Sequence, residues 1–228
     1  MSELPQHIGY IVDGNRRWAK ARGMSAREGH KAGYEVLKQV LLDTVAAGVP
    51  YVSAYVFSTE NWKRTKAEVQ WLMALLVRVL RDDLHVFIDN NIRVRILGSR
   101  ERLSKKVIAA IEMAEAKTAH LTGGQALLCL NYGGQLEIAD AVNALIKSGI
   151  KAGEVTPEHI EQYLYASDVP ACDLVVRTSG EQRLSNFMLW RSAYSELLFI
   201  DKAWPDMTKR DVTAILKQYA RRGRRFGG

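Results

Sequence analysis

The sequence contains little cysteine and no long apolar run. Cys129 and Cys172 are the only cysteines among 228 residues, and each lies in an apolar stretch far from the other. We therefore expect two buried thiols rather than a disulfide or a metal knuckle. Charged residues interrupt the longest apolar stretches well before the roughly 20 residues that a membrane-spanning helix needs. The amino terminus has neither the basic region nor the apolar segment of a signal peptide, which favours a cytoplasmic protein.

Several familiar phosphate and metal motifs are also absent. No glycine-rich loop ends in Gly-Lys-Ser or Gly-Lys-Thr, and no Gly-x-Gly-x-x-Gly follows the first predicted strand. These absences argue against a P-loop nucleotidase and a dinucleotide-dependent oxidoreductase. No His-Glu-x-x-His occurs, and the histidines lack the spacing of zinc ligands. Asp82-Asp83 could begin an aspartate-rich metal motif, but Val86 stands where its third aspartate belongs, so we expect a solvated helix face.

Positive charge is in excess, with 32 lysines and arginines against 25 acidic residues and a formal net charge of +7. Part of the excess lies at the carboxyl terminus, where Arg221, Arg222, Arg224 and Arg225 fit a solvated chain end. The remaining charge could bind an anionic substrate or a nucleic acid. The sequence has no zinc finger and no aromatic-rich basic ribonucleoprotein signature. We therefore expect an anionic small-molecule substrate and no nucleic acid.

Apolar runs alternate with helical patterns along the chain. Short apolar or β-branched runs predict strands at 8–12, 51–57, 92–97, 126–131, 173–177 and 197–200. Apolar residues at helical spacing predict helices at 30–47, 66–91, 103–120, 136–146 and 211–219, a short helix opening at 156–158, and a loop at 23–29. No linker, repeat or low-complexity stretch interrupts this order. The alternation predicts one α/β domain over residues 1–228, with a mostly parallel central β-sheet flanked by helices.

The predicted helix at 66–91 has an unusually wide apolar face. It would be about 39 Å long at 1.5 Å per residue. Such a face fits a helix packed in the core, a helix packed against a partner subunit, or one wall of a long apolar tunnel. Periodicity does not separate these interpretations.

Polar clusters follow three of the predicted strands, at 13–18, 58–64 and 177–186. A parallel sheet with right-handed crossovers brings such strand ends to one edge. Arginine is well suited to phosphate because its planar fork matches the phosphate oxygens. A carboxylate beside a Gly-Asn turn suits a metal-bound phosphate, so we infer a polyanionic ligand, with a diphosphate as the best fit. The basic and hydroxyl residues concerned are Arg16, Arg17, Arg64, Arg177, Arg183, Ser58, Thr59 and Ser185.

The same clusters resemble the motifs of the cis-prenyltransferase family. The resemblance is carried by His7-Ile8 through Asp13-Gly14-Asn15-Arg16-Arg17-Trp18-Ala19, by Gly29-His30-Lys31-Ala32-Gly33, by the blocks 57–64 and 177–187, by Glu196, by Trp204-Pro205 and by the terminal Arg224-Arg225-Phe226-Gly227-Gly228. These segments keep the family's order and run almost from end to end. The sequence is most similar to the bacterial isoprenyl transferases, which include undecaprenyl diphosphate synthase.

The resemblance implies a Mg²⁺-dependent enzyme that condenses isopentenyl diphosphate repeatedly with an allylic diphosphate such as farnesyl diphosphate. The product would be a (Z)-polyprenyl diphosphate such as undecaprenyl diphosphate, the lipid-carrier precursor for cell-wall and glycan synthesis, which grows in an apolar product tunnel. By the family pattern, Asp13 is the central catalytic residue and binds Mg²⁺. Glu196 completes the metal site, often from across the interface of a homodimer.

The family pattern also assigns the substrate-binding residues. Gly14, Asn15, Arg16, Arg17 and His30 would hold the allylic diphosphate. Arg177, Arg183 and Ser185 would hold isopentenyl diphosphate. The further residues expected at the substrate site are Trp18, Arg27, Ser58, Thr59, Glu60, Trp62, Arg64 and Leu184.

Asn61 is the residue that the family pattern names as proton acceptor. A neutral amide is a poor acceptor near pH 7, so we expect Asn61 to orient the substrate while a diphosphate oxygen or water takes the proton. The sequence departs from the pattern at Ala26, where many relatives carry arginine, and we expect the neighbouring Arg27 to replace it. It also has Arg16 where many bacterial members have glycine, a change that we expect to leave function intact.

Two alternatives remain open within this resemblance. Val56 and Leu130 could narrow the tunnel, which would make the protein a short-chain cis-prenyl diphosphate synthase. The protein could instead be a non-catalytic accessory subunit, although such subunits usually lose the Asp-Gly-Asn motif that is present here. Delivery of a lipid product also leaves open a peripheral contact with the membrane.

Overall fold

The strands form one parallel sheet at the centre of the molecule. The computed structural model describes residues 4–222, and in this range the strand order is β3-β4-β2-β1-β5-β6 with every neighbouring pair parallel. The predicted parallel α/β fold is therefore confirmed. The strands are β1 (His7–Ile11), β2 (Tyr51–Ser58), β3 (Ile92–Leu97), β4 (Gly124–Tyr132), β5 (Leu174–Arg177) and β6 (Glu196–Phe199).

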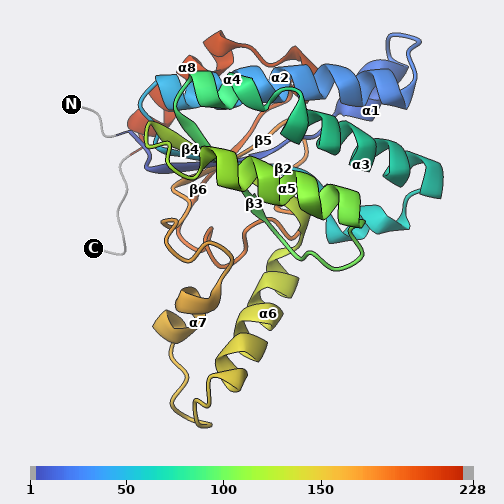
Figure 1. Cartoon of the computed structure of the whole chain (residues 1–228). Helices are drawn as coiled ribbons and strands as arrows, with labels where there is room; N and C mark the ends of the chain where they lie inside the picture. Colours follow the sequence, from blue (N-terminus) through green and yellow to red (C-terminus); the bar gives the residue numbers. More distant parts are fainter. Residues whose placement is uncertain (1–3, 223–228) are drawn as a thin grey trace.

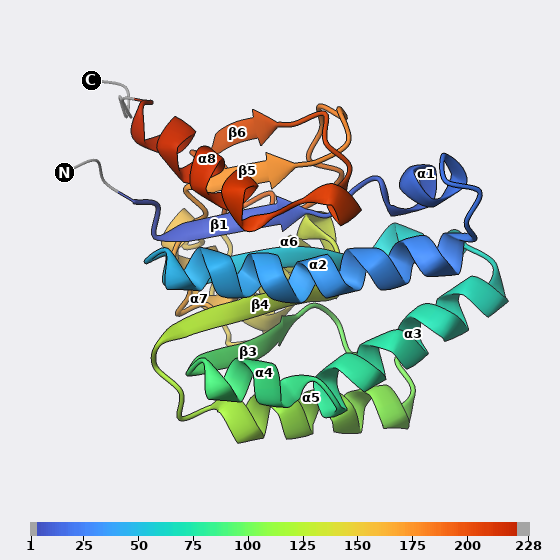
Figure 2. The same cartoon turned by 90° about the horizontal axis from the view of Figure 1, so that it is seen from above.

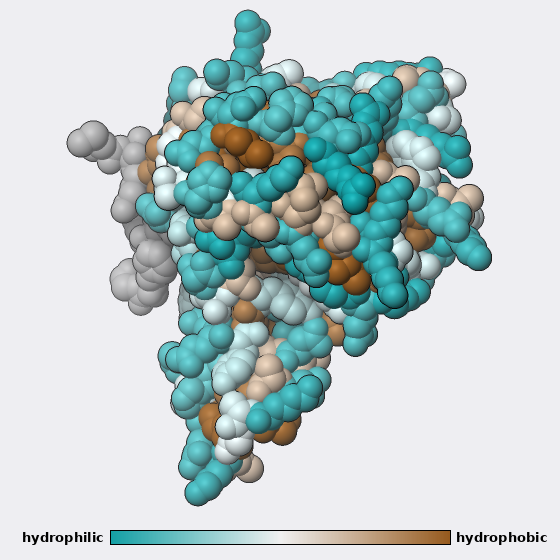
Figure 3. Space-filling model, viewed as in Figure 1, coloured by the Kyte–Doolittle hydropathy of each residue, from teal (hydrophilic) through white to brown (hydrophobic). Residues whose placement is uncertain are grey.

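Helices cover both faces of the sheet. The larger apolar core lies under α2 (Ala26–Ala46), α3 (Lys66–Arg81), α4 (Leu84–Asp89), α5 (Lys105–Thr118) and α8 (Lys209–Ala220). A smaller core on the other face packs Tyr55 and Leu127 against Phe187 and Met188. On that side α6 (Gly134–Lys147) and α7 (Pro157–Tyr163) extend away from the body of the protein (Figure 1). The view in Figure 3 is mostly hydrophilic, with its hydrophobic residues in small separate groups.

The central strand β1 shows why the sheet is arranged in this way. Every residue of β1 is buried, because the strand lies between β2 and β5 and has a packed layer on each face. Its sequence is accordingly apolar on both sides rather than alternating. The arrowheads of β1, β5 and β6 point toward the side on which α1 (Asn15–Lys20) lies (Figure 2). The carboxyl ends of these strands therefore share one edge.

The segment after β1 contains more helix than we predicted. Residues 15–20 form α1 rather than a simple turn, and α2 begins at Ala26 instead of residue 30. The early start of α2 comes from a capping box at Ser25. The Ser25 Oγ accepts a hydrogen bond from the Glu28 N–H at 3.3 Å, and the Glu28 carboxylate accepts one from the Ser25 N–H at 2.7 Å. The predicted loop at 23–29 is correspondingly shorter.

The prediction of one helix over 66–91 is wrong. The helix ends after Arg81, and α4 starts at Leu84. The expectation that Asp82-Asp83 forms a solvated face is wrong for Asp83, whose side chain is only 17% exposed. Its Oδ2 accepts a hydrogen bond from the Tyr34 hydroxyl at 2.8 Å. Aspartate interrupts helices readily because its side chain can bond to other partners, and here that partner lies on α2.

Two further expectations concern cysteine and membrane spans. Cys129 and Cys172 are free and buried, as predicted. Among residues 4–222, no helix combines the length and the hydropathy needed to cross a membrane.

Candidate active site

Three polar clusters meet at the carboxyl edge of the sheet, as the sequence predicts. The cluster after β1 contacts the cluster after β5 through the Arg177 guanidinium, whose Nη2 lies 2.9 Å from Asp13 Oδ2. The cluster after β2 contacts the same β5 segment through Asn186, whose Nδ2 donates to Glu60 Oε1 at 3.0 Å. These contacts join segments more than 120 residues apart in the sequence. The parallel topology therefore builds the site from strand ends.

Asp13 lies at the centre of this edge. Besides Arg177, its carboxylate is 3.4 Å from Arg17 Nη2 and accepts a hydrogen bond from the Gly14 N–H at 2.7 Å. Partial burial raises the pKa of Asp13, but the hydrogen bonds from Arg177 and Gly14 and the nearby guanidinium charges outweigh burial and hold the pKa below its ordinary value. Asp13 is therefore an ionised carboxylate at neutral pH.

Gly14 turns the chain sharply after Asp13. Its φ is +103°, and a Cβ on this residue would lie 2.8 Å from Ser179 Oγ. Any other residue here would be strained by the backbone angle and crowded by the β5 loop. Glycine at this position allows the carboxylate of Asp13 and the helix α1 to come close to Arg177.

Two polar cavities of about 570 Å³ each open on either side of Asp13. They share Val12, Asp13 and Arg64 as lining residues. We call the cavity beside α1 the first polar cavity and the cavity beside the β5 loop the second polar cavity. The first is also lined by Gly14, Asn15, Arg16, Arg17, Lys20, Met24, Ala26 and His30. The second is also lined by Ile11, Tyr55, Ser58, Glu60, Asn61, Arg177, Ser185 and Asn186.

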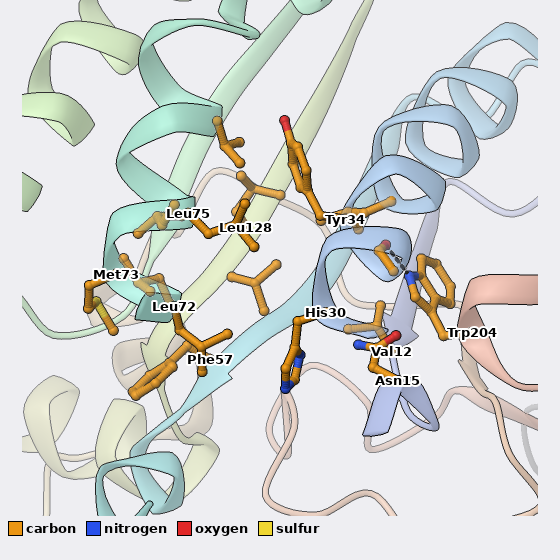
Figure 4. A pocket seen from close by; sticks show the side chains of 16 residues that line it. Val12, Asn15, His30, Tyr34, Phe57, Leu72, Met73, Leu75, Leu128 and Trp204 are labelled. Carbon is orange, nitrogen blue, oxygen red and sulfur yellow. Dashed lines mark hydrogen bonds between the residues drawn. The ribbon is translucent and has the colours of Figure 1, made fainter. Parts of the chain in front are cut away.

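An apolar cavity lies next to the first polar cavity. It has a volume of about 90 Å³ and runs between α2 and α3 over the sheet (Figure 4). Val12, Asn15 and His30 line both cavities, so the two adjoin at these residues. The second polar cavity shares only Val12 with the apolar one. A ligand with an anionic head and an apolar tail therefore fits the first polar cavity, with its tail directed between α2 and α3.

Two polar atoms at this junction lack hydrogen-bond partners. Asn15 Oδ1 and His30 Nε2 are buried and unbonded, and His30 Nε2 is 3.7 Å from Glu68 Oε1, which is too far for a hydrogen bond. Burial lowers the pKa of His30 to about 4, helped by the charge of Arg64. His30 is thus a neutral imidazole at pH 7. A buried polar atom without a partner is costly. The Asn15 Oδ1 packs against Gly33 of α2, where a Cβ would lie 2.2 Å from it, and the His30 side chain lines both cavities.

Most cations around Asp13 are already paired with carboxylates. Arg17 Nη1 lies 2.9 Å from Glu181 Oε1, and Arg64 Nη1 lies 3.0 Å from Glu68 Oε1. In the part of the chain that the structure describes, Arg16 and Lys20 line the first polar cavity without an ion pair or hydrogen bond from their side chains. They are one turn apart on α1, so their side chains share a face. This face carries two positive charges available to an anion.

Lys20 lines the first polar cavity but was not among the predicted site residues, and Arg27 was predicted to replace the arginine that many relatives carry at the position of Ala26. The structure places Ala26 in the lining of the first polar cavity, whereas Arg27 is exposed and does not line it. Lys20 lies four residues after Arg16, a spacing that places both on one helix face, but we predicted no helix after the Gly14-Asn15 turn. Asn186 also lines the second polar cavity, and it lies in the 177–187 block without having been predicted as a site residue.

The second polar cavity is organised by Arg177, which is 5% exposed. Its Nη1 donates to the carbonyl oxygen of Arg183 at 2.5 Å and to Ser185 Oγ at 2.7 Å. Ser185 and Asn186 have positive φ angles of 49° and 67°. Such backbone conformations are costly for residues other than glycine and often occur at functional loops. The loop thereby turns Ser185 and Asn186 toward the cavity.

Several predicted substrate residues lie outside the lining of both polar cavities. Trp18 Nε1 donates to Asp206 Oδ1 at 2.6 Å, and Trp62 Nε1 donates to Asn131 Oδ1 at 2.7 Å. Both indole N–H groups are therefore used in hydrogen bonds within the protein, and neither indole lines a polar cavity. Arg183 is 58% exposed and its guanidinium pairs with Glu181. The remaining two are Thr59, beside Gly133, and Leu184, packed against the smaller core.

Glu196 does not meet Asp13 within one chain. It lies at the start of β6 and pairs with Leu174, which in turn pairs with Ile8 near the start of β1. Asp13 follows the other end of β1, roughly 16 Å away at 3.3 Å per residue. Glu196 Oε2 is instead 2.7 Å from Arg222 Nη1. Within one chain, Glu196 therefore does not share a site with Asp13.

The donor set around Asp13 fits Mg²⁺ bound together with phosphate. Among residues 4–222, no cluster of three or more His, Cys, Asp or Glu side chains forms a metal cage. Mg²⁺ is usually bound by one or two carboxylates and by substrate phosphates, rather than by an all-protein cage. An ionised Asp13 at the border of two anion-binding cavities supplies one such carboxylate. The residues present therefore suit the metal that the family implies.

The fold and the site define an enzyme that brings together two anionic substrates, one of which carries an apolar chain. Residues 11–227 match the family model described as "Putative undecaprenyl diphosphate synthase". The chain belongs to this family of cis-prenyltransferases, and it is a prenyltransferase.

Relatives at high identity agree with this assignment. The chain is 48% identical to an isoprenyl transferase of Thermotoga maritima, over 99% of this chain and 97% of the relative. It is 46% identical to a trans,polycis-polyprenyl diphosphate synthase ((2Z,6E)-farnesyl diphosphate specific) of Thermobifida fusca, over 99% of this chain and 81% of the relative. The crystal structure of lavandulyl diphosphate synthase from Lavandula x intermedia, in complex with dimethylallyl diphosphate, superposes with a TM-score of 0.94 at 32% identity and covers 99% of both chains.

Proposed function

We propose that the protein condenses isopentenyl diphosphate with an allylic diphosphate and repeats the reaction to give a (Z)-polyprenyl diphosphate such as undecaprenyl diphosphate. Such a product is the lipid-carrier precursor for cell-wall and glycan synthesis. One observation carries the proposal. Two polar cavities share Asp13, and the first of them adjoins an apolar cavity at Asn15 and His30, which do not line the second.

This arrangement assigns the two substrates to different cavities. The allylic diphosphate belongs in the first polar cavity, because its hydrocarbon chain needs the adjoining apolar space. Isopentenyl diphosphate belongs in the second polar cavity, where Arg177 and Ser185 can hold its phosphates. Its diphosphate can also reach Arg183 when that guanidinium leaves Glu181. The shared border at Asp13 then brings the two reacting carbons together.

The residues of the first polar cavity act on the leaving diphosphate. The allylic C–O bond breaks, the new C–C bond forms with isopentenyl diphosphate, and negative charge grows on the departing diphosphate. Arg16, Arg17 and Lys20 stabilise that charge, and the neutral His30 can donate one hydrogen bond to it. Asp13 would hold Mg²⁺ against the diphosphate oxygens, and the metal would supply further charge neutralisation when bound.

Asn61 is better suited to positioning than to proton transfer. Its Oδ1, the atom that would take a proton, accepts a hydrogen bond from the Ser58 N–H at 3.2 Å. The side chain lines the second polar cavity, where its amide N–H groups can orient isopentenyl diphosphate. A diphosphate oxygen or water then accepts the proton that the new chain end loses.

A homodimer is part of the proposal, because Glu196 can approach a metal at Asp13 only from a second copy. Glu196 and Leu197 begin the edge strand β6. Leu197 is a large apolar side chain that is 37% exposed, as expected of a residue that a second copy would cover. We also propose that the enzyme is cytoplasmic and contacts the membrane peripherally, because its product is a lipid.

A short-chain product is the second candidate, supported by the small apolar cavity. Val56 and Leu130 both line it, and its volume of about 90 Å³ is smaller than the roughly 150 Å³ of an engineered cavity that binds benzene. A longer chain would require α2 and α3 or their side chains to move apart.

The deciding experiment is incubation with farnesyl diphosphate, radiolabelled isopentenyl diphosphate and Mg²⁺, followed by chromatographic analysis of chain length. We expect label in polyprenyl products of the wild type and none with Asp13→Ala. A wild type without incorporation, or Asp13→Ala with full incorporation, would overturn the proposal. Products of one or two condensations would favour the short-chain alternative.

A further inference from the structure

The far end of the apolar cavity carries a polar contact that the proposed reaction does not use. The Tyr34 hydroxyl on α2 donates to Asp83 Oδ2 at 2.8 Å, and Asp83 forms the break between α3 and α4. Lys38 Nζ lies 3.6 Å from the same oxygen and 4.8 Å from the centre of the Tyr34 ring. We call this set of Tyr34, Lys38 and Asp83 the latch. It ties α2 to the α3–α4 junction.

The latch closes one end of the cavity. The Tyr34 ring lines the cavity and is 7% exposed. Among the labelled residues of Figure 4, it lies at the end opposite His30 and Asn15, with its hydroxyl pointing away from them. A chain that enters beside His30 and advances between the helices therefore meets the Tyr34 ring.

The latch is stronger than the rest of this wall. Leu72, Met73 and Leu75 on α3 make only nondirectional apolar contacts with the cavity, so they can change rotamer at low cost. Tyr34 is held by a hydrogen bond to a charged, mostly buried carboxylate and by a cation beside its ring. Burial and the charge of Asp83 raise the pKa of Tyr34 far above its ordinary value, so the hydroxyl remains a donor. A growing chain would displace the α3 side chains before it displaces Tyr34.

We propose that the Tyr34–Asp83 hydrogen bond sets how far a prenyl chain can enter the cavity, and thereby sets the length at which elongation stops. The inference rests on the proposed function, because it concerns the product of that reaction. Elongation continues while the growing chain can be accommodated by displacing the apolar side chains of α3. It stops when the next unit would have to break the latch.

The test compares product length for Tyr34→Phe and Asp83→Ala with the wild type. Each variant removes the hydrogen bond and leaves the diphosphate cavities intact. We expect both to shift the main product to longer chains by at least one isoprene unit. The double variant should match the single variants, because both remove the same interaction.

Two matched variants sharpen the comparison. Asp82→Ala removes the exposed neighbouring aspartate at the same junction and should leave product length unchanged. Asp83→Asn keeps an oxygen that can accept from Tyr34 and should restore most of the wild-type distribution. Unchanged product length in both Tyr34→Phe and Asp83→Ala, or the same lengthening by Asp82→Ala, would overturn the proposal.

A binding measurement separates this proposal from the proposed function. Calorimetric titration with alkyl diphosphates from decyl to eicosyl needs no turnover. We expect the affinity of the wild type to rise with chain length up to a limit. The affinity of Tyr34→Phe should go on rising beyond that limit. If the wild type forms no product, the proposed function fails while this series still decides the latch. The same cut-off in both proteins would reject the latch even in an active enzyme.

Discussion

The guanidinium of Arg177 and the carboxylate of Asp13 meet across the neighbouring strands β5 and β1, with Nη2 2.9 Å from Oδ2. Each strand ends on the same side of the sheet, so the last buried residue of one faces the first polar residue after the other. The contact holds Asp13 ionised and fixes it at the border of the two polar cavities. It therefore links the two proposed substrate positions.

Asp13→Asn tests this central carboxylate with almost no change in shape. We expect incorporation of isopentenyl diphosphate to fall by roughly 100- to 1,000-fold, the scale on which removal of one electrostatic stabiliser acts. The matched control is Asp168→Asn, which breaks the Asp168–Arg95 pair of 2.7 Å outside the site. Equal losses in the two variants, measured by radiolabel incorporation, would contradict a special role for Asp13.

Lys20→Ala decides which cation replaces the family arginine missing at Ala26. We expect the KM for the allylic diphosphate to rise roughly 10- to 100-fold, equivalent to the 1.5–3 kcal/mol of a hydrogen bond to a charged group, with little change in the KM for isopentenyl diphosphate. Arg27→Ala is the control and should leave both constants near the wild type. The reverse result in steady-state kinetics would restore the original prediction for Arg27.

The buried imidazole of His30 should make stability depend on pH. The unfolded chain binds a proton near the ordinary pKa of 6.5, whereas the folded protein binds it only near its lowered pKa of about 4. Stability is therefore lost as the pH falls from about 6.5 toward 4, with a slope of up to about 1.4 kcal/mol per pH unit from this residue. His30→Gln should reduce the slope in urea unfolding at several pH values. His120→Gln removes an exposed imidazole and serves as the control.

Asn131→Ala should weaken the support behind Trp62. The Asn131 side chain accepts from Trp62 Nε1 at 2.7 Å and donates to the carbonyl oxygens of Ser99 and Glu101, both at 2.9 Å. Its φ is +47°, a conformation that asparagine tolerates better than alanine. We expect a loss of about 2–4 kcal/mol in the free energy of unfolding, from about 1 kcal/mol per hydrogen bond and a similar backbone cost. Asn90→Ala, at an exposed helix end, should cost less than about 1 kcal/mol; comparable losses would show that Asn131 has no special structural role.

Glu196 and Asp13 can be tested by mixing two inactive variants. If Glu196 acts in the site of a second copy, Asp13→Asn mixed with Glu196→Gln restores part of the activity, because one site of each mixed dimer contains both wild-type residues. Each variant alone should remain inactive. An inactive mixture, with mixed dimers verified by native mass spectrometry, would rule out the exchange of Glu196 between subunits.

The sequence was sufficient to place the central chemistry of the site. Asp13 and Ser58 each follow a predicted strand and Arg177 ends one, and the rule that parallel strands end at one edge brings them together without further information. The periodicity of apolar residues likewise predicted the main helices. Both signals are local, so they can be read from a short window of sequence.

The side chains that the sequence misplaced depend on distant partners. Trp18 turns to Asp206 and Trp62 turns to Asn131, 188 and 69 residues away in the chain. A motif shows that these residues belong near the site but does not show which way the indoles face. The break at Asp83 has the same origin, since the apolar periodicity continues across it and its hydrogen-bond partner is on α2.

Helix α2 links the head of the substrate to the end of its chain. His30, Tyr34 and Lys38 follow one another at successive turns on one face, so the imidazole at the proposed diphosphate site lies about 6 Å from Tyr34 and about 12 Å from Lys38 along the helix axis. A tilt of α2 that widens the far end therefore also moves His30 relative to the diphosphate. Binding of the diphosphate and the width of the apolar cavity are therefore coupled through α2. A chain that pushes α2 away from α3 weakens the contacts of its own diphosphate with the enzyme.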